Sequence, residues 1–423
     1  MACLFTAARR AVVLLLLAAL LGGATARPAQ GQQIAKYGAD FLAGGVGARA
    51  IGLGGAYVGL ADDVTAGYWN PAGFAQMPYP EIGYMHVERF GGVVSFDYGG
   101  AAFPVGRQST VGLTVIRSGV NDIVNTLNAY QLVDGGGGEP VGQPVPNYPS
   151  SITRFSAADY LVSFSYAHVL GEHLSVGGSG KVSRRSIGEF ADSWGYSADL
   201  GVQYRTGLWG EENNFTLGLQ LQDAFPYIQS WSVNPNAFQI DNFEKKCRYG
   251  ANDENIFSEC LDADGNVIDD NAARFDSLFS QEIPEGQTEL VTPTARLGSG
   301  LIVPVDEQGS SVTVGAGGDV RFDGRRAFLL NVGDVSFEPR LGAEFDYRNV
   351  VAVRGGINRV QHSDRLGLDL TPSVGAGLNL AQFSINYAFG DFGGASSELG
   401  YSHRISAQLR LEQPGLARSD DEE

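Results

Sequence analysis

Residues 196–205 read YSADLGVQYR, and apolar and polar side chains alternate along the whole stretch. Because successive side chains of an extended strand point to opposite faces, this stretch predicts a strand with one apolar and one polar face. The apolar face carries Tyr196, Ala198, Leu200, Val202 and Tyr204, and the polar face carries Ser197, Asp199, Gly201, Gln203 and Arg205. Strands that cross a membrane in a β-barrel have this pattern, with lipid on one side and a polar lumen on the other.

The same alternation recurs along the rest of the chain and predicts fourteen strands. They are expected at 81–90, 93–104, 109–117, 159–168, 173–186, 194–206, 214–222, 294–303, 311–322, 337–348, 351–360, 366–380, 382–389 and 402–411. An even number of strands is a property of single-chain bacterial barrels.

The lengths of the predicted connections support the same architecture. Every second connection is short, at 106–108, 169–172, 207–213, 306–309, 349–350 and 381, whereas 118–158 and 223–293 are long. Bacterial barrels have short periplasmic turns and longer outer loops. We therefore expect an all-β, fourteen-stranded antiparallel transmembrane β-barrel of the outer membrane over 79–411, with 223–293 as a long extracellular loop. A soluble β-sandwich or an exported propeller is the alternative, because alternating strands occur there too.

The polar faces carry many ionisable residues, among them Asp199, Asp319, Arg321, Glu344 and Arg354. Each would cost a few kcal/mol in hydrocarbon, so these faces are expected to line a lumen that holds water or a polar plug. If a carboxylated ligand enters the lumen, Lys181, Arg185 and Arg354 are candidate partners for it. The alternative is that the three form ion pairs with the acidic lumenal residues.

The N-terminus has the layout of a secretory signal peptide over residues 1–26. Arg9 and Arg10 precede the apolar stretch 11–21, and the small residues Ala24, Thr25 and Ala26 form a signal-peptidase cleavage site. No later stretch contains 18 consecutive apolar residues, which excludes a helical membrane protein. The formal net charge of −18 makes a nucleic-acid partner a poor expectation. Export by a cleaved signal and location in the outer membrane, with its lipid as a neighbour, are the predictions.

Residues 41–78 differ from the strands because their glycines cluster and no alternation is sustained. Glycines permit positive φ and close backbone contacts, so 27–78 is expected to form a compact plug, or hatch, in the lumen. Asp62 and Asp63 could cap a short helix that ends before Pro71. The run Gly45 to Ala50 also fits a loose dinucleotide fingerprint, G-x-G-x-x-A, but the strand, helix and parallel sheet that this motif needs are not visible.

The run GARAIGLGGAYVGLADDVTAGYWNPAGFAQ at 47–76 resembles the N-terminal signature of the PorV/PorQ proteins and of their wider relatives, the FadL-type outer-membrane transporters. The residues that carry the resemblance are Gly47, Arg49, Gly54, Gly55, Asp62, Asp63, Trp69, Asn70 and Pro71. The resemblance implies a hatch inside a fourteen-stranded barrel. One feature departs from the pattern: outer-membrane barrels commonly end on an aromatic residue, whereas this chain continues as an acidic tail over 412–423.

The resemblance implies two functions. PorV-like members act in type IX secretion, where they bind secretion subunits and exported cargo domains, and this binding or shuttle role is the first expectation. FadL-like members instead pass long-chain fatty acids or other hydrophobic small molecules, and this is the alternative. The five histidines are scattered and G-x-S-x-G is absent, so neither an enzyme nor a cofactor is expected.

The long predicted loop contains two further patterns. Cys247 and Cys260 are expected to form a disulfide in an oxidising compartment, worth on the order of 3 kcal/mol, although two free thiols are the alternative. Asp262, Asp264, Asn266 and Asp269 are a weak calcium candidate, because the spacing of Gly265 does not match an EF-hand loop. An acidic surface turn is the simpler interpretation.

Overall fold

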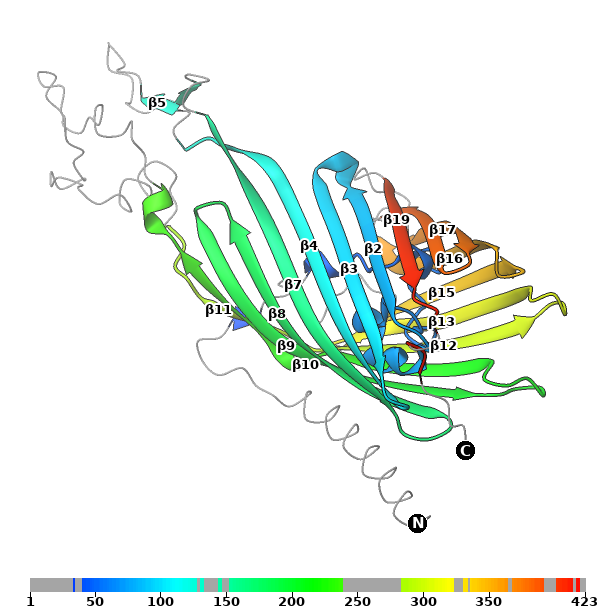
Figure 1. Cartoon of the computed structure of the whole chain (residues 1–423). Coiled ribbons are helices and arrows are strands. Elements are labelled where there is room, and N and C mark those ends of the chain that lie inside the picture. Colours follow the sequence, from blue (N-terminus) through cyan, green and yellow to red (C-terminus); the bar gives the residue numbers. More distant parts are fainter. Residues whose placement is uncertain are drawn as a thin grey trace, which may run out of the picture.

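The computed structural model describes residues 33–34, 40–127, 130–132, 144–146, 152–238, 283–322, 330–333, 335–363, 367–391, 401–413 and 416–418. Within these ranges, fourteen long antiparallel strands form a closed barrel (Figure 1). They are β2 (Glu81–Arg89), β3 (Val94–Val105), β4 (Ser109–Asn125), β7 (Thr153–Val169), β8 (Leu174–Ile187), β9 (Ala191–Thr206), β10 (Phe215–Val233), β12 (Thr294–Pro304), β13 (Ser311–Arg321), β15 (Val335–Tyr347), β16 (Val351–Ser363), β17 (Gly367–Leu380), β18 (Phe383–Asp391) and β19 (Tyr401–Arg410).

The wall closes because the last strand pairs with the first, with Ile405 of β19 opposite His86 of β2. All fourteen strands expected from the sequence are present, and the predicted barrel is confirmed. The short connections 106–108, 170–173, 207–214, 305–310, 348–350 and 381–382 lie at one end of the barrel, which we call the turn end. The opposite end is the loop end.

Three strands reach further towards the loop end than the alternation predicts. β4 continues to Asn125, β7 begins at Thr153, and β10 continues to Val233. The predicted loops 118–158 and 223–293 are therefore wrong at their margins. On β4 and β7 the outward residues Gly119 and Ala158 are small, so the apolar half of the alternation is lost there. On β10 the register with β9 shifts between Leu221 and Ile228, which interrupts the alternation.

Several short strands and 3-10 helices accompany the fourteen long strands. β1 (Gln33–Ile34) pairs in parallel with β11 (Thr288–Val291), β14 (Leu330–Val332) pairs with β15, and β5 (Tyr130–Leu132) pairs with β6 (Pro144–Pro146). Two 3-10 helices, η3 (Phe90–Gly92) and η5 (Pro235–Phe238), follow β2 and β10. In the described part of the chain, no helix is both long and apolar enough to span a membrane.

The two faces of the wall differ as the alternation predicts. On β9, Tyr196 is 58% exposed on the outward face, while Asp199 is 3% exposed on the inward face. Asp319, Glu344 and Arg354 are also buried on inward faces. The outward face is therefore an apolar surface suited to lipid, and the charged residues point inward.

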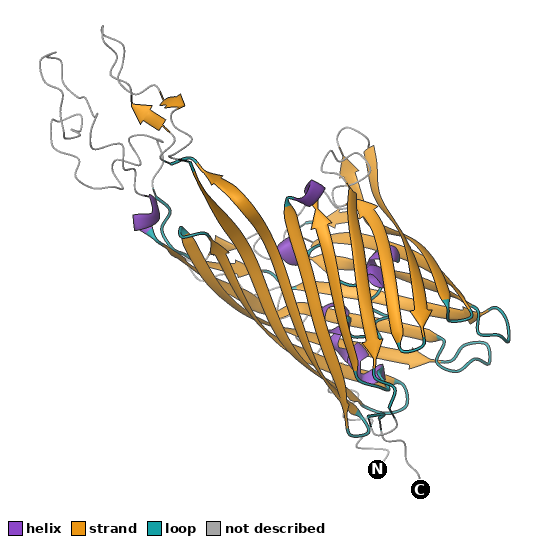
Figure 2. Ribbon diagram, turned by 45° about the horizontal axis from the view of Figure 1, so that its top comes forward, coloured by secondary structure: helices purple, strands orange, loops and turns teal. Residues whose placement is uncertain are grey.

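The interior of the barrel is occupied by residues 40–77, which we call the inner segment. It contains η1 (Asp40–Leu42), α2 (Ala48–Gly52), α3 (Ala66–Trp69) and η2 (Pro71–Gln76), which lie within the ring of strands (Figure 2). Its apolar side chains are buried and form the main part of the hydrophobic core, together with inward residues of β2, β3, β4, β7 and β18. The core of this protein therefore lies between the inner segment and the wall.

Candidate functional site

The inner segment turns at glycines of the sequence motif. Gly47 has φ 79° before α2, and Gly54 and Gly55 have φ 64° and 72° after it. Residues with a Cβ disfavour this left-handed region, so these turns favour glycine. The helix between them projects Arg49 from the inner segment towards the wall.

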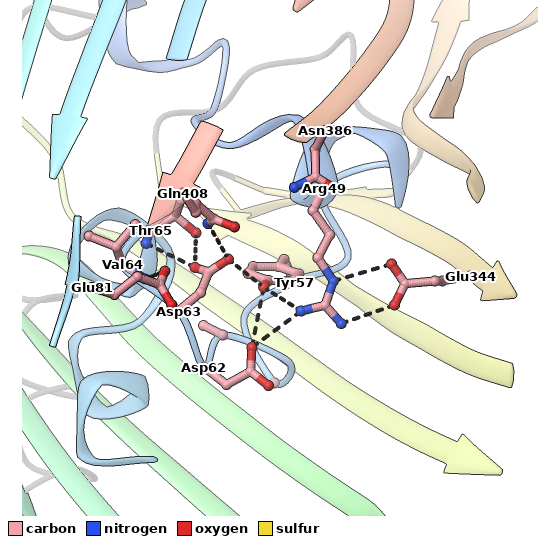
Figure 3. Close-up of polar contacts among 12 residues, drawn as sticks. Arg49, Tyr57, Asp62, Asp63, Val64, Thr65, Glu81, Glu344, Asn386 and Gln408 are labelled. Atoms are coloured by element: carbon pink, nitrogen blue, oxygen red, sulfur yellow. Dashed lines mark hydrogen bonds and ion pairs between the residues drawn. The ribbon is translucent and has the colours of Figure 1, made fainter. Parts of the chain in front are cut away.

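Arg49 is the centre of a polar network that joins the inner segment to the wall (Figure 3). Its Nε and Nη2 donate to the two carboxylate oxygens of Glu344 on β15, at 3.2 and 3.0 Å. Its Nη1 donates to the Tyr57 hydroxyl at 3.2 Å and to Asp62 Oδ1 at 3.4 Å. Burial lowers the pKa of Arg49, but Glu344, Tyr57 and Asp62 together outweigh burial and raise the pKa above its ordinary value. The bidentate pair is a strong and directional attachment.

Asp63 makes a second attachment beside the first. Its Oδ1 accepts from the Thr65 backbone N–H at 2.8 Å, just before α3, and its Oδ2 accepts from Gln408 of β19 at 2.9 Å. Glu81 of β2 accepts from the Val64 backbone N–H at 3.0 Å (Figure 3). The predicted capping role is wrong for both aspartates: α3 begins after Thr65 without a side-chain capping bond, Asp63 binds the Thr65 N–H before the helix, and Asp62 bonds to Arg49 and Tyr57.

The Trp-Asn-Pro step makes a third attachment on the opposite wall. Trp69 donates its indole N–H to the Val46 carbonyl at 2.8 Å. Asn70 donates to the Val202 carbonyl of β9 at 3.1 Å, and its side-chain oxygen accepts from the Ala72 N–H at 3.2 Å. α3 ends at Trp69, and Pro71 is the first residue of η2. All nine motif residues therefore lie in the inner segment, where they shape or anchor it.

Inward glycines of the wall let the backbone of the inner segment approach closely. A Cβ on Gly315 of β13 would lie 2.5 Å from the Ala56 carbonyl oxygen, which is too close for any real contact. Gly342 of β15 lies against the Leu53 carbonyl, and Gly218 of β10 lies against the Val58 carbonyl. Because this contact recurs from strand to strand, the inner segment fits the wall without side chains between the two backbones.

The three cations named as candidate ligand partners all have partners within the protein. Lys181 Nζ lies 2.6 Å from both Asp199 and Asp223. Arg185 pairs with Asp159 at 2.7 Å and lies near the rings of Phe41 and Trp231. Arg354 pairs with Glu344 and donates to Asn386 at 2.8 Å. The arrangement matches the alternative of lumenal ion pairs.

Arg404 of β19 differs from these cations. It is 1% exposed and points inward, two residues from Ser406, whose hydroxyl accepts from the Ala48 N–H at 3.2 Å. Among the described residues, no acceptor hydrogen-bonds or ion-pairs with the Arg404 guanidinium. Its neighbour in register is Val87, and Arg89 lies two residues further along β2 with its guanidinium 4.0 Å from the Phe96 ring. Arg404 is not among the site residues predicted from the sequence, although the alternation in the predicted strand 402–411 places it on the inward face.

A polar cavity of about 460 Å³ lies between the inner segment and the turn end. It is lined by the anchoring charges, by amides of the wall and by turn residues, among them Arg49, Asp62, Asp63, Glu81, Glu344, Arg354, Asn386 and Gln408. The motif residues Arg49, Asp62 and Asp63 thus face a common polar cavity.

The tail after β19 returns to the inner segment. Arg418 donates from Nη1 to the Ala75 carbonyl at 2.6 Å and from Nη2 to the Thr110 hydroxyl of β4 at 2.8 Å. Its backbone N–H donates to the Pro78 carbonyl at 2.9 Å. The tail therefore bridges the end of the inner segment and the wall.

Comparisons with known proteins return solved structures of channels and transporters. No family model matches the chain, and no curated protein matches it. The CymD monoaromatic hydrocarbon channel is similar at 13% identity, with 87% of this chain and 98% of that chain covered and a TM-score of 0.46. The Ralstonia pickettii toluene transporter TbuX gives 12% identity, coverage of 87% and 98%, and a TM-score of 0.44. A Pseudomonas aeruginosa FadL homologue gives 10%, 85% and 97%, and 0.43. Because no family model matches, the PorV/PorQ resemblance stays a prediction.

Two predictions fall outside the described residues. These are the pairing of Cys247 with Cys260 and the calcium candidate at Asp262, Asp264, Asn266 and Asp269. Across the ranges that the structure does describe, no three His, Cys, Asp or Glu side chains gather in a way that could hold a metal ion.

Proposed function

We propose that this barrel binds hydrophobic compounds in its lumen and passes them across the outer membrane, with a preference for compounds that carry an anionic head group. The observation that carries the proposal is the buried guanidinium of Arg404, for which no described residue supplies an acceptor. A buried charge without a partner is costly. A carboxylate on an apolar ligand would supply the missing acceptors.

The surroundings of Arg404 suit the rest of such a ligand. Its register partners Val87 and Ala388 are both fully buried members of the hydrophobic core, as is Phe96 beside Arg89. These side chains have no exposed surface, so an amphiphile places its chain against them and its head at the guanidinium only when the inner segment moves. This combination of an apolar surface with one oriented charge is typical of small-molecule sites.

The inner segment argues against an open aqueous pore. Its anchors to β9, β15 and β19 and its backbone contacts with wall glycines fill the space that a porin leaves for water. A solute must then move the inner segment or leave through the wall.

One of the irregularities in the wall suits a sideways exit. β10 pairs with β12 up to Gln222 opposite Thr294, and with β11 from Tyr227 opposite Val291. Between these ladders, Asp223 has φ 56° and the register with β9 shifts. We infer that this interruption is where an apolar solute passes between lumen and lipid.

The secretion role remains the less supported proposal. It requires a surface for secretion subunits or cargo domains, and no contact among the described residues favours one. The signal peptide and its cleavage after Ala26 also remain predictions, since residues 1–32 are outside the described ranges.

Binding by the purified full-length barrel in lipid nanodiscs tests the proposal. The probes are a pyrene-labelled long-chain carboxylic acid and the matching alcohol. Replacing Arg404 with Gln should weaken binding of the acid by about 10- to 100-fold, because the hydrogen bonds from the charged guanidinium to the carboxylate are lost. Binding of the alcohol should be nearly unchanged. Arg184→Gln is the control, because Arg184 lies on the outward face with its side chain 54% exposed.

Two results would contradict the proposal. If the wild-type barrel binds neither probe, the lumen does not take hydrophobic compounds. If Arg404→Gln and Arg184→Gln bind the acid equally well, Arg404 is not its partner. Co-purification of secretion subunits with a barrel that binds neither probe would favour the secretion role.

A further inference from the structure

Polar residues form a continuous line across the outward face of β2, β3, β4 and β7. In register, His86 lies opposite Asp97, Asp97 opposite Arg117, and Arg117 opposite Tyr160. We call these four residues the polar seam. Their side chains face outward, and those of His86, Asp97 and Arg117 are 46%, 26% and 33% exposed.

The seam is held together by contacts between neighbouring strands. His86 Nδ1 lies 2.8 Å from Asp97 Oδ1, and the Tyr84 hydroxyl donates to the same oxygen at 2.7 Å. Arg117 Nη1 donates to Ser95 at 3.1 Å and lies 3.5 Å from Asp97 Oδ2. The charges of Asp97 and Arg117 compensate each other, so the seam is polar without being strongly charged.

The chemistry of the outward face changes across the seam. The row of paired residues next to it on the turn-end side is Tyr84, Gly99, Val115 and Val162. The row on the loop-end side is Glu88, Ser95, Gly119 and Ala158. The side chains of the first row are apolar, apart from the tyrosine hydroxyl. The second row has no large apolar side chain.

We propose that the surface of the bilayer on the loop-end side meets the barrel at the polar seam. The partner is the headgroup layer of the lipid leaflet. Charged side chains on the lipid face cost about 2–4 kcal/mol at the bilayer midplane but about 0–1 kcal/mol near its surface. Tyrosines such as Tyr84 and Tyr160 prefer the same depth, where the ring is in an apolar layer and the hydroxyl in a polar one.

The line of register pairs is inclined to the plane of the membrane. This inclination determines which residues lie outside the bilayer. Followed from His86 through Ile405 and Tyr387, the line reaches Val303, one residue from the turn end of β12. Followed the other way, it climbs from Tyr160 to Arg184 of β8 and Trp194 of β9. Strands about 4.8 Å apart and tilted by about 40° give a climb of roughly 3 Å per strand.

Arg184 and Trp194 therefore lie above the bilayer surface in this placement. Consistent with an aqueous position, Arg184 forms an exposed ion pair with Asp192 at 3.0 Å. The parts of β4, β7 and β10 nearest the loop end, which the alternation did not predict, would stand beyond the lipid as a one-sided wall. On β4 and β7, the outward residues next to the seam on that side are Gly119 and Ala158, which are small.

Depth-dependent quenching tests the placement without depending on any transported ligand. Cys247 and Cys260 are replaced by Ser, and a single cysteine carrying a bimane fluorophore is placed at Val115 or Gly119 on β4, or at Val162 or Ala158 on β7. The members of each pair are four residues apart, about 13 Å along the strand. Labels at 115 and 162 should be quenched by lipids brominated on their acyl chains, and labels at 119 and 158 by aqueous iodide.

A double variant tests the seam itself. Asp97→Leu with Arg117→Leu removes both charges together and extends the apolar outward face towards the loop end. The label at Gly119 should then become accessible to brominated chains. Equal acyl-chain quenching at all four sites in the unaltered barrel would overturn the proposal, as would iodide quenching at all four. A label at 119 that does not respond to the double variant would show that the seam does not set the depth.

Discussion

Replacing Gly315 with Ala should destabilise the barrel because the new methyl group would collide with the inner segment. The added Cβ would lie 2.5 Å from the Ala56 carbonyl oxygen and 3.0 Å from Leu60 Cδ1. An ordinary contact needs about 3.5 Å, so the inner segment must move by close to 1 Å. Forced overpacking of this kind costs typically about 1–3 kcal/mol.

Gly355→Ala is the matched control. Gly355 of β16 is also a strand glycine, but a Cβ there meets nothing within 4 Å. The intrinsic effect of exchanging glycine for alanine in a strand is therefore shared by both variants, and their difference isolates the collision.

Urea unfolding of the barrel folded in lipid vesicles gives the measurement. The midpoint of Gly315→Ala should fall by an amount that corresponds to about 1–3 kcal/mol relative to Gly355→Ala, with the same slope. Equal midpoints would refute the reasoning, because they would mean that the inner segment does not rest against β13.

Three further substitutions test individual attachments. Arg49→Leu removes both bonds to Glu344, which keeps Arg354 as a partner, and should cost about 2–3 kcal/mol in urea unfolding; no change would mean the network is not formed. Lys181→Met leaves the buried Asp199 and Asp223 unpaired and should cost about 3–5 kcal/mol; a neutral effect would contradict the buried triad. Arg418→Ala removes the bonds to Ala75 and Thr110 and should speed protease cleavage near residue 78, with unaltered cleavage as the contrary result.

Most of the barrel could be predicted from the sequence because the physical rule is local. A strand with lipid on one side and a polar interior on the other must alternate, and YSADLGVQYR shows this without any knowledge of its neighbours. The same rule fails for Ser118–Asn125, where the strand continues but outward residues such as Gly119 are small. It also fails for Asp223–Val233, where the register with β9 shifts between Leu221 and Ile228 and interrupts the alternation. Hydrogen bonds between strands extend further than the hydrophobic pattern does.

The inner segment could be located from its glycines, but its contacts could not. Arg49 meets Glu344, and Asp63 meets Gln408, across almost 300 residues or more of sequence. Those pairings depend on how the strands are arranged around the ring, which no local pattern encodes. For the same reason the lumenal cations could not be sorted into paired and unpaired ones, and Arg404 was overlooked while Lys181, Arg185 and Arg354 were selected.

Electrical conductance of the wild-type barrel in a planar lipid bilayer tests the central claim most directly. If the inner segment fits the wall as described, the barrel should insert without a steady ion current, because no continuous path of water runs along its axis. A stable, porin-like conductance in the wild-type protein would contradict the account, since it would require a water-filled passage where the inner segment meets β9, β13 and β15.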